Sequence, residues 1–176
     1  VRRVRHFYPA SDPEPGVIMR CLVTGAGGFV GLALARELRA AGHTVIGLSR
    51  QSYPALADLG VMQVQADLAA TEALLAATRD IEVVFHVASR VGLGGTYQDF
   101  FETNVVGTKN LLHACRISGV QRLIYTSSPS VVAGGGHGAK KRGGIPAAPL
   151  PPSFGPYLAT ATLRFSRITV IFTWPG

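Results

Sequence analysis

The chain has 176 residues, of which 47% are hydrophobic and 15% charged, as expected for a single soluble domain of ordinary size. No stretch reaches the roughly 18 consecutive apolar residues that a membrane-spanning helix needs, which excludes a membrane span. The cysteines Cys21 and Cys115 have no spacing typical of a metal site or a disulfide framework, and we expect buried free thiols in a cytoplasmic protein.

The formal net charge of +7 is unevenly distributed. Residues 19–102 carry six Arg against eight acids, whereas residues 103–176 carry eight Lys or Arg and no acid. The basic run Lys140, Lys141 and Arg142 has no aromatic platform or recognisable binding fold beside it, so we expect no nucleic-acid partner. A basic segment this long without acids indicates a change of character along the chain.

Residues 1–18 contain three prolines and no hydrophobic period, which predicts a disordered leader before Met19. Strand-like and helix-like segments alternate from there. The expected strands are residues 20–24, 44–48, 61–64, 83–87 and 122–126. The expected helices are residues 29–41, a short one near 54–59, 71–78 capped by Thr71, and 97–117 closed by Gly119. This alternation predicts an α/β fold, a Rossmann-type doubly wound parallel sheet.

After Val132 the composition becomes that of loops, rich in Gly and Pro. A short helix from Tyr157 and a strand near 168–174 are the regular elements expected there. We therefore expect a Rossmann dinucleotide-binding domain at 19–133 and an irregular, aberrant segment at 134–176, so that the C-terminal part of the fold is incomplete.

The segment 24–31, TGAGGFVG, lies between a strand and a helix, where a phosphate-binding turn belongs. Gly25 permits the tight turn, Gly28 lets a pyrophosphate approach the backbone, and Gly31 lets the helix pack on the strand. The helix N-terminus offers N–H groups and partial positive charge to the anion. The expected cofactor-binding residues here are Gly25, Gly27, Gly28, Phe29, Val30 and Gly31.

The end of the second strand predicts which dinucleotide is bound. An acid there would bind the ribose 2′-hydroxyl of NAD, but the chain reads Ser49-Arg50. The hydroxyl and the guanidinium suit the 2′-phosphate of NADP. The alternative is an Arg that is merely solvated at a strand end. We expect NADP or NAD, with NADP slightly preferred.

Together with these residues, five motifs in order over 19–132 resemble the extended short-chain dehydrogenases, the NAD-dependent epimerase/dehydratase family. Besides TGAGGFVG, they are Asp67-Leu68, His86-Val87-Ala88, the stretch NVVGT from Asn104, and YTSS from Tyr125. The segments YPALADLGV, VGLGGTYQDFFETNV and TSSPSVV look most like 3β-hydroxysteroid dehydrogenases and 2-alkyl-3-oxoalkanoate reductases. The resemblance implies that Asp67, Leu68, Val87, Ala88 and Asn104 also contact the cofactor. It implies a small-molecule substrate and a homodimer through residues 97–117.

Three of these residues also have plain structural interpretations. Asp67 could simply cap the turn before Ala69, His86 could be a satisfied core histidine, and Asn104 could be a helix cap. Their order along the chain, rather than any one of them, favours the family.

In that family a serine, a tyrosine and a lysine four residues after the tyrosine perform the chemistry. The tyrosine acts as general acid or base, and the lysine lowers its pKa from about 10. Ser128 matches the serine and Tyr157 the tyrosine, but Ala161 stands where the lysine is expected. The nearest downstream cation, Arg164, lies about 10 Å further along a helix axis.

The resemblance implies an NAD(P)-dependent oxidoreductase that acts on a secondary alcohol or ketone, such as a sterol or a β-keto acid, and the missing lysine predicts impaired activity. The missing lysine gives an alternative, a non-catalytic dinucleotide-binding sensor or interaction module. The acid-free tail also suits a truncated or frame-shifted, non-functional gene fragment. No metal site is expected.

Overall fold

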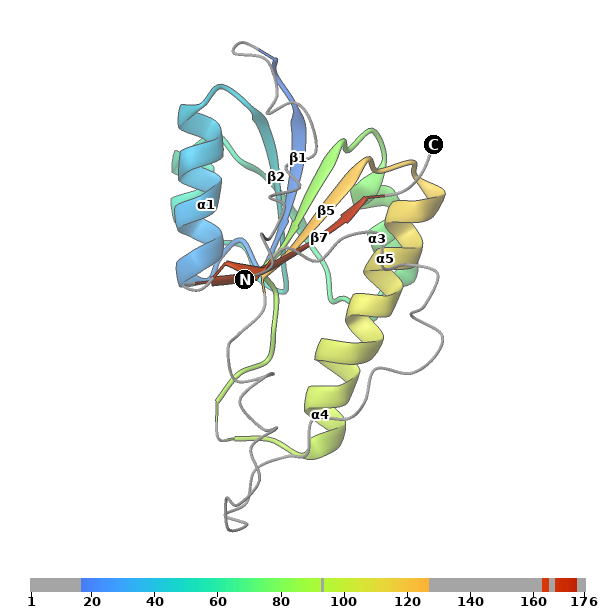
Figure 1. Ribbon diagram of the computed structural model, residues 1–176. Helices are drawn as coiled ribbons and strands as arrows, with labels where there is room; N and C mark the ends of the chain where they lie inside the picture. The colour runs from blue at the N-terminus through green and yellow to red at the C-terminus, as the bar shows by residue number, and fades with distance from the viewer. Residues whose placement is uncertain (1–16, 93, 127–162, 165–166, 174–176) are drawn as a thin grey trace, which may run out of the picture.

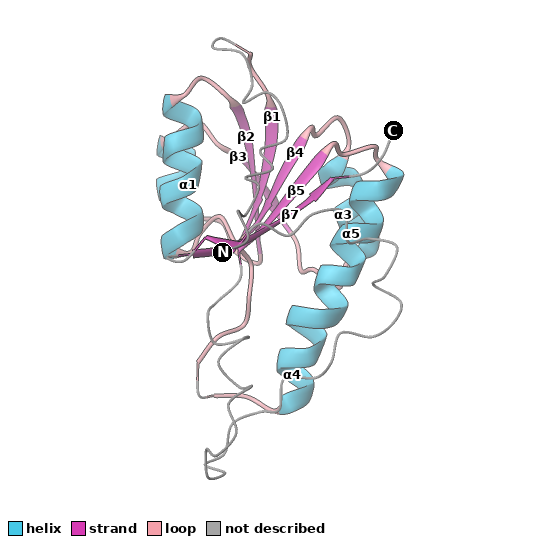
Figure 2. Cartoon of the chain, in the orientation of Figure 1, coloured by secondary structure: helices cyan, strands magenta, loops and turns pink. Residues whose placement is uncertain are grey.

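The computed structural model describes residues 17–92 and 94–126 in full, together with the backbone of two strands at 163–164 and 167–173. Five parallel strands form the centre of the sheet in the order β3-β2-β1-β4-β5 (Figures 1 and 2). They are β1 (Arg20–Thr24), β2 (Thr44–Ser49), β3 (Met62–Gln65), β4 (Val83–His86) and β5 (Arg122–Thr126). The predicted doubly wound parallel sheet is therefore confirmed, with all five strands in the expected places.

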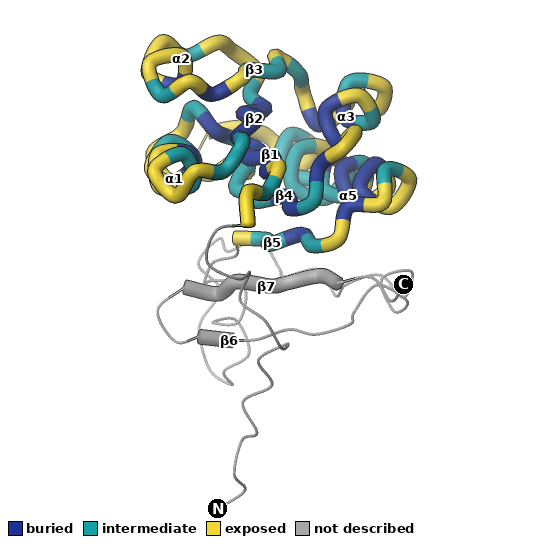
Figure 3. Tube along the Cα trace, turned by 90° about the horizontal axis from the view of Figure 1, so that it is seen from above, coloured by how far each residue is buried: buried dark blue, intermediate teal, exposed yellow. Residues whose placement is uncertain are grey.

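Helices cover both faces of this sheet (Figure 3). They are α1 (Phe29–Ala40), α2 (Pro54–Asp58), α3 (Thr71–Thr78), α4 (Tyr97–Phe101) and α5 (Gly107–Ile117). Thr71 is the first residue of α3 rather than its cap, because Ala70 precedes the helix without a side-chain hydrogen bond. The predicted helix ending, by contrast, is present: Gly119 follows α5 with a φ of +69°, which glycine adopts without strain.

The predicted long helix 97–117 is helical throughout but is not a uniform α-helix. A π-helical segment, η1 (Glu102–Val106), separates α4 from α5. Such a segment holds one more residue per turn than an α-helix and is frequent at functional sites. The sequence pattern predicts one continuous helix here and does not predict this segment.

The core consists of two layers, one on each face of the sheet. Successive strand residues point to opposite faces, so Leu22 and Val23 of β1 belong to different layers. The layer with Leu22 contains α3 and α5, through residues such as Leu74 and Leu111, and the layer with Val23 contains α1 and α2. Because both faces are covered, the inner strands β2 and β4 read as nearly continuous apolar runs.

Two further strands lie within the C-terminal segment that was expected to be irregular. The strand β7 (Arg167–Thr173) pairs antiparallel with β5 and coincides with the strand-like stretch 168–174, and β6 (Leu163–Arg164) pairs with β7. The sheet order is therefore β3-β2-β1-β4-β5-β7-β6. The sheet therefore continues beyond β5 with the antiparallel strand β7 and then with β6.

The order of the parallel strands reverses between β1 and β4. From β1 the chain proceeds to β2 and β3 on one side, then crosses to β4 and β5 on the other. In open α/β sheets ligands bind in the crevice outside the carboxyl ends of the strands at this reversal. The fold therefore places a binding crevice beside the turn that follows β1.

Candidate dinucleotide-binding site

A cavity of about 610 Å³ lies at the carboxyl ends of the parallel strands. Its volume is in the range of small-molecule and cofactor sites. The structure brings twelve of the thirteen predicted cofactor-binding residues to its wall: Gly25, Gly27, Gly28, Phe29, Val30, Gly31, Ser49, Arg50, Asp67, Leu68, Val87 and Ala88. The thirteenth, Asn104, is not part of the wall, which its neighbour Thr103 joins instead. Sequence reasoning did not single out Tyr53 or Arg90, which also line the cavity.

The glycines of the turn are required for different reasons. Gly25 has a φ of +67°, and a Cβ there would lie 2.8 Å from the Ala88 Cα. A Cβ on Gly31 would collide with the Gly25 carbonyl, so the helix packs directly on the turn. At Gly28 a Cβ would meet only the Gly25 carbonyl oxygen, at 3.3 Å. Gly28 therefore leaves its surface open to a ligand, as a pyrophosphate requires.

The N-terminus of α1 suits an anion. Gly28 caps this helix without a side-chain hydrogen bond, and the first turn contains no acid. Its leading N–H groups therefore have no side-chain acceptor and carry the positive end of the helix dipole. Helix N-termini of this kind commonly bind phosphate groups.

Gly27, besides lining the cavity, packs against Tyr53. A Cβ on Gly27 would overlap the Tyr53 ring, so that ring packs directly on the glycine backbone. The Tyr53 backbone is held by the Gln63 side chain, which accepts from its N–H at 2.8 Å and donates to its carbonyl at 3.1 Å. Strand β3 thus fixes the aromatic residue that covers the turn.

The ends of β2 and β3 form the wall near the expected adenosine position. Ser49 Oγ accepts from the Gly27 N–H at 3.3 Å, which leaves the Ser49 hydroxyl proton available to a ligand. Asp67 Oδ1 accepts from the Ala69 N–H at 2.9 Å, so Asp67 caps this turn as well as lining the cavity. The capping interpretation of Asp67 is therefore confirmed, and the contact with a cofactor stays a prediction.

Leu68 is held by the helix that carries the NVVGT motif. A Cβ on Gly107 would lie 2.7 Å from the Leu68 Cβ, and Asn110 Nδ2 donates to the Leu68 carbonyl at 3.1 Å. The glycine of that motif is therefore needed for close packing against the loop after β3. Two motifs that are distant in the sequence act here on one wall of the cavity.

His86 is a fully buried, fully paired histidine at the end of β4. Its Nδ1 lies 2.7 Å from Thr24 Oγ1, and its Nε2 lies 2.9 Å from Thr108 Oγ1. The Thr24 oxygen accepts the Val87 and Ala88 N–H groups, both at 3.2 Å, so its own proton is directed at Nδ1. The ring is therefore neutral and protonated on Nε2. Burial lowers the pKa of His86 to about 4.

The same chain of hydrogen bonds continues into the π-helical segment. Thr108 Oγ1 donates to the Asn104 carbonyl at 2.7 Å. The Asn104 side chain accepts from the Arg90 N–H at 2.8 Å and donates to the Arg90 carbonyl at 3.0 Å. Asn104 is thus neither a helix cap nor part of the cavity wall. It fixes the backbone of the loop after β4, which does line the cavity.

The two predicted buried thiols are present in the structure. Cys21 and Cys115 are buried and free, and burial raises their pKa to about 11 and about 12. Ser128, Tyr157 and Ala161 lie outside the described residues. Among the helices of the described ranges, none has the length and apolar character needed to cross a membrane.

The glycine turn, the open helix end and the cavity at the strand reversal define a Rossmann-type dinucleotide-binding domain. The sequence comparison gives the particular family: residues 21–164 match the NAD dependent epimerase/dehydratase family, and the chain belongs to it. The expected family is thereby confirmed.

Two relatives with similar sequences are named for different reactions. A 2-alkyl-3-oxoalkanoate reductase of Stenotrophomonas maltophilia (strain K279a) is 40% identical over 85% of the chain and 46% of the relative. A 3-beta-hydroxysteroid dehydrogenase of Mycolicibacterium neoaurum is 42% identical over 66% of the chain and 34% of the relative. The chain therefore spans less than half the length of these relatives.

Solved structures with the same fold contain NAD. The UDP-glucose-4-epimerase from Stenotrophomonas maltophila, with bound NAD and formylated UDP-arabinopyranose, has a TM-score of 0.59 and 28% identity. That match covers 64% of the chain and 38% of the epimerase. MoeE5, in complex with UDP-glucuronic acid and NAD, has a TM-score of 0.58 and 34% identity, over 64% of the chain and 38% of MoeE5.

The packing of Tyr53 on Gly27 is expected to be visible as a coupling between the two residues. Gly27→Ala should destabilise the chain by about 1–3 kcal/mol, because the new methyl group overpacks against the ring. Tyr53→Ala should relieve that clash, so the double variant loses less stability than the sum of the single ones. Gly31→Ala is the matched control, since it meets backbone atoms that Tyr53→Ala cannot move. Urea unfolding measures all of these, and additive losses would contradict the packing.

The buried neutral His86 makes stability depend on pH between about 6.5 and 4. In this window the unfolded chain binds a proton at His86 and the folded chain does not, so stability falls as pH falls. The full loss is about 3 kcal/mol by pH 4 and is absent above pH 7. Unfolding of wild type and His86→Gln should differ in slope across this window.

The same ring can be observed directly. Nitrogen-15 NMR of the folded chain should show His86 neutral, with its proton on Nε2, at pH 5.5. The half-buried His43 and the exposed His113 serve as internal references. A His86 ring that is protonated at pH 5.5 would be inconsistent with the burial and hydrogen bonds described above.

Proposed function

We propose that the chain forms the cofactor-binding part of an NAD(P)-dependent oxidoreductase. The reaction is hydride transfer involving a secondary alcohol or ketone of a sterol or β-keto acid. The observation that carries this proposal is the cavity at the strand reversal, in which the glycine turn and the open end of α1 meet the ends of β2, β3 and β4. The names of the relatives support the substrate classes.

Each part of the cavity has a role in this proposal. The N-terminus of α1 binds the pyrophosphate, with Gly28 giving it room. Ser49 and Arg50 bind the 2′-phosphate of NADP, and Asp67 and Leu68 contact the adenine. When bound, the nicotinamide exchanges a hydride with the substrate carbon. Val87 and Ala88 form the floor beneath it.

Two residues outside the described ranges are proposed to act on the substrate. Tyr157 donates or accepts the proton of the substrate oxygen, and Ser128 hydrogen-bonds the same oxygen. The cation that would keep Tyr157 acidic is replaced by Ala161, so turnover is proposed to be slow. The proposal extends to a cytoplasmic homodimer through α4 and α5, whose outer ends expose Tyr97 and Ile117.

A second candidate is a dinucleotide-binding sensor or interaction module, which the same alanine favours. Such a module would use the same cavity and bind the cofactor tightly, but it would catalyse no reaction. A non-functional gene fragment is the third alternative. Circular dichroism melting with and without NADPH separates it from the other two, since a folded domain is stabilised by its ligand.

Cofactor preference is tested by fluorescence titration with NADPH and NADH. We expect tighter binding of NADPH, because Arg50 and Ser49 offer a cation and a hydroxyl donor to the 2′-phosphate. Arg50→Glu should weaken NADPH binding by about tenfold or more, equal to about 1.4 kcal/mol, with less effect on NADH. Arg116→Glu, on the exposed end of α5, is the matched charge control. Equal binding of both cofactors refutes the preference, and binding of neither refutes the proposed function.

The role of the missing lysine is tested by restoring it. Ala161→Lys should raise the rate of 3-hydroxy acid oxidation by ~10²-fold, within the range that a general acid–base group supplies. Ala161→Lys combined with Tyr157→Phe should return to the low rate. Ala161→Met, which restores length without charge, is the control. Tight cofactor binding with no turnover in any variant would instead favour the sensor.

A further inference from the structure

Arg90 occupies the cavity wall on the side opposite Arg50. It follows β4, whereas Arg50 follows β2, and the strand order reverses between β1 and β4. In this fold the two halves of a dinucleotide lie on the two sides of the reversal. Arg90 is therefore on the half that faces the reacting end of the cofactor and the substrate.

The backbone of Arg90 is rigidly placed. Both its N–H and its carbonyl are bound by the Asn104 amide, at 2.8 Å and 3.0 Å. The guanidinium carbon lies 5.6 Å from the centroid of the Phe100 ring, in a cation–π contact. The backbone hydrogen bonds and the ring contact thus restrict where the guanidinium can lie.

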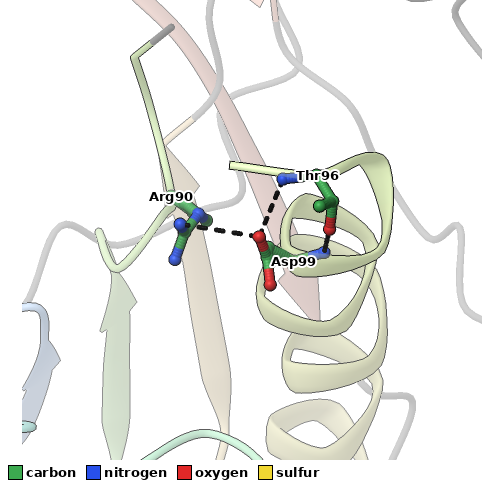
Figure 4. A network of polar contacts seen from close by, with 3 residues as sticks. All are labelled: Arg90, Thr96 and Asp99. Carbon is green, nitrogen blue, oxygen red and sulfur yellow. Dashed lines mark hydrogen bonds and ion pairs between the residues drawn. The ribbon is translucent and has the colours of Figure 1, made fainter. Parts of the chain in front are cut away.

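The guanidinium nevertheless has hydrogen-bonding capacity left. Its Nε is buried and has no hydrogen-bond partner among the described residues. Figure 4 shows its ion pair with Asp99. The pair is long, with 3.8 Å between Nη2 and Oδ2, and both side chains are more than a third exposed. Such an exposed pair contributes little stability.

Asp99 makes its hydrogen bonds with Thr96. It caps the start of α4, where Oδ2 accepts from the Thr96 N–H at 2.8 Å and the Asp99 N–H donates to Thr96 Oγ1 at 3.2 Å. Hydrogen bonds from Thr96 are the main reason that the pKa of Asp99 is lowered, and the charge of Arg90 contributes least. The Asp99 carboxylate is thus a weak resting partner that a better-aligned anion can replace.

We propose that Arg90 binds the carboxylate of the substrate, so that the substrate class is a 3-oxo or 3-hydroxy carboxylic acid. This rests on the proposed function and chooses between its substrate classes. A guanidinium binds a carboxylate through two parallel N–H···O bonds, and the accessible part of Arg90 is the end that carries its Nη groups. A neutral sterol offers no anion to pair with this charge. The pyrophosphate has its own site at the N-terminus of α1.

Binding rather than turnover tests this assignment, because turnover depends on residues outside the cavity. The probes are 3-hydroxyoctanoate and its methyl ester, titrated into the full chain saturated with NADP⁺ and measured by calorimetry. The acid should bind wild type at least about tenfold more tightly than the ester. Arg90→Met should abolish this difference and leave NADPH affinity within about twofold of wild type. Arg90→Lys should keep part of the difference, since its charge remains without the fork.

Controls distinguish the possible failures. Arg79→Met removes an exposed cation outside the cavity and should leave the preference for the acid unchanged. Equal binding of acid and ester to wild type, or no binding of the acid, overturns the role of Arg90 while the NADPH titration still tests the cofactor site. A loss of NADPH affinity in Arg90→Met, with the preference for the acid intact, assigns the guanidinium to the cofactor phosphates instead. If Arg90→Met does not fold, Arg90→Lys serves in its place. If Arg90→Lys prefers the acid to the ester as strongly as wild type does, the two-bond contact of the guanidinium is refuted.

Discussion

The close approach of the end of β1 to the end of β4 is the contact on which the site depends. At Gly25 and Ala88 two backbones meet so closely that no side chain fits between them. The Thr24 hydroxyl joins them, because it accepts two N–H groups from the loop after β4 and donates to His86. The glycine turn therefore has a fixed position relative to the opposite half of the sheet. A ligand that spans both halves meets a surface that is already arranged.

The two ends of the cavity, on either side of this contact, carry different side chains. On the β2 side, Ser49 and Arg50 offer a hydroxyl and a cation, and Tyr53 covers the turn beside them. On the β4 side, Arg90 offers a second cation. Residues 19–102 carry more acids than bases, yet two of their six Arg line the cavity. The positive charge there is local, as recognition of an anionic ligand at both ends would require.

Much of this could be predicted from the sequence. The strands and helices follow from apolar runs and from the Gly and Pro residues that separate them, and the turn follows from glycines between a strand and a helix. Packing across the fold could not be predicted in this way. The contact of Tyr53 with Gly27 and the amide of Asn104 on Arg90 join residues that are 26 and 14 positions apart. Neither pair forms a periodic pattern, and local propensity carries no information about such contacts. Arg90 was overlooked for the same reason, because a single Arg after a strand resembles any solvated one.

The π-helical segment has a consequence for the geometry of the whole helix. An α-helix turns by about 100° per residue, so the extra residue in η1 shifts the phase of everything that follows. Within η1, Thr103 lines the cavity and Asn104 binds the loop after β4, whereas Leu111, Leu112 and Cys115 of α5 belong to the buried core. Removing one residue between the two groups would rotate them relative to each other by about 100°. The π-helical turn thus sets the rotation between the residues at the cavity and the residues in the core. Inserting or deleting one residue in this helix would change which of its side chains face the sheet.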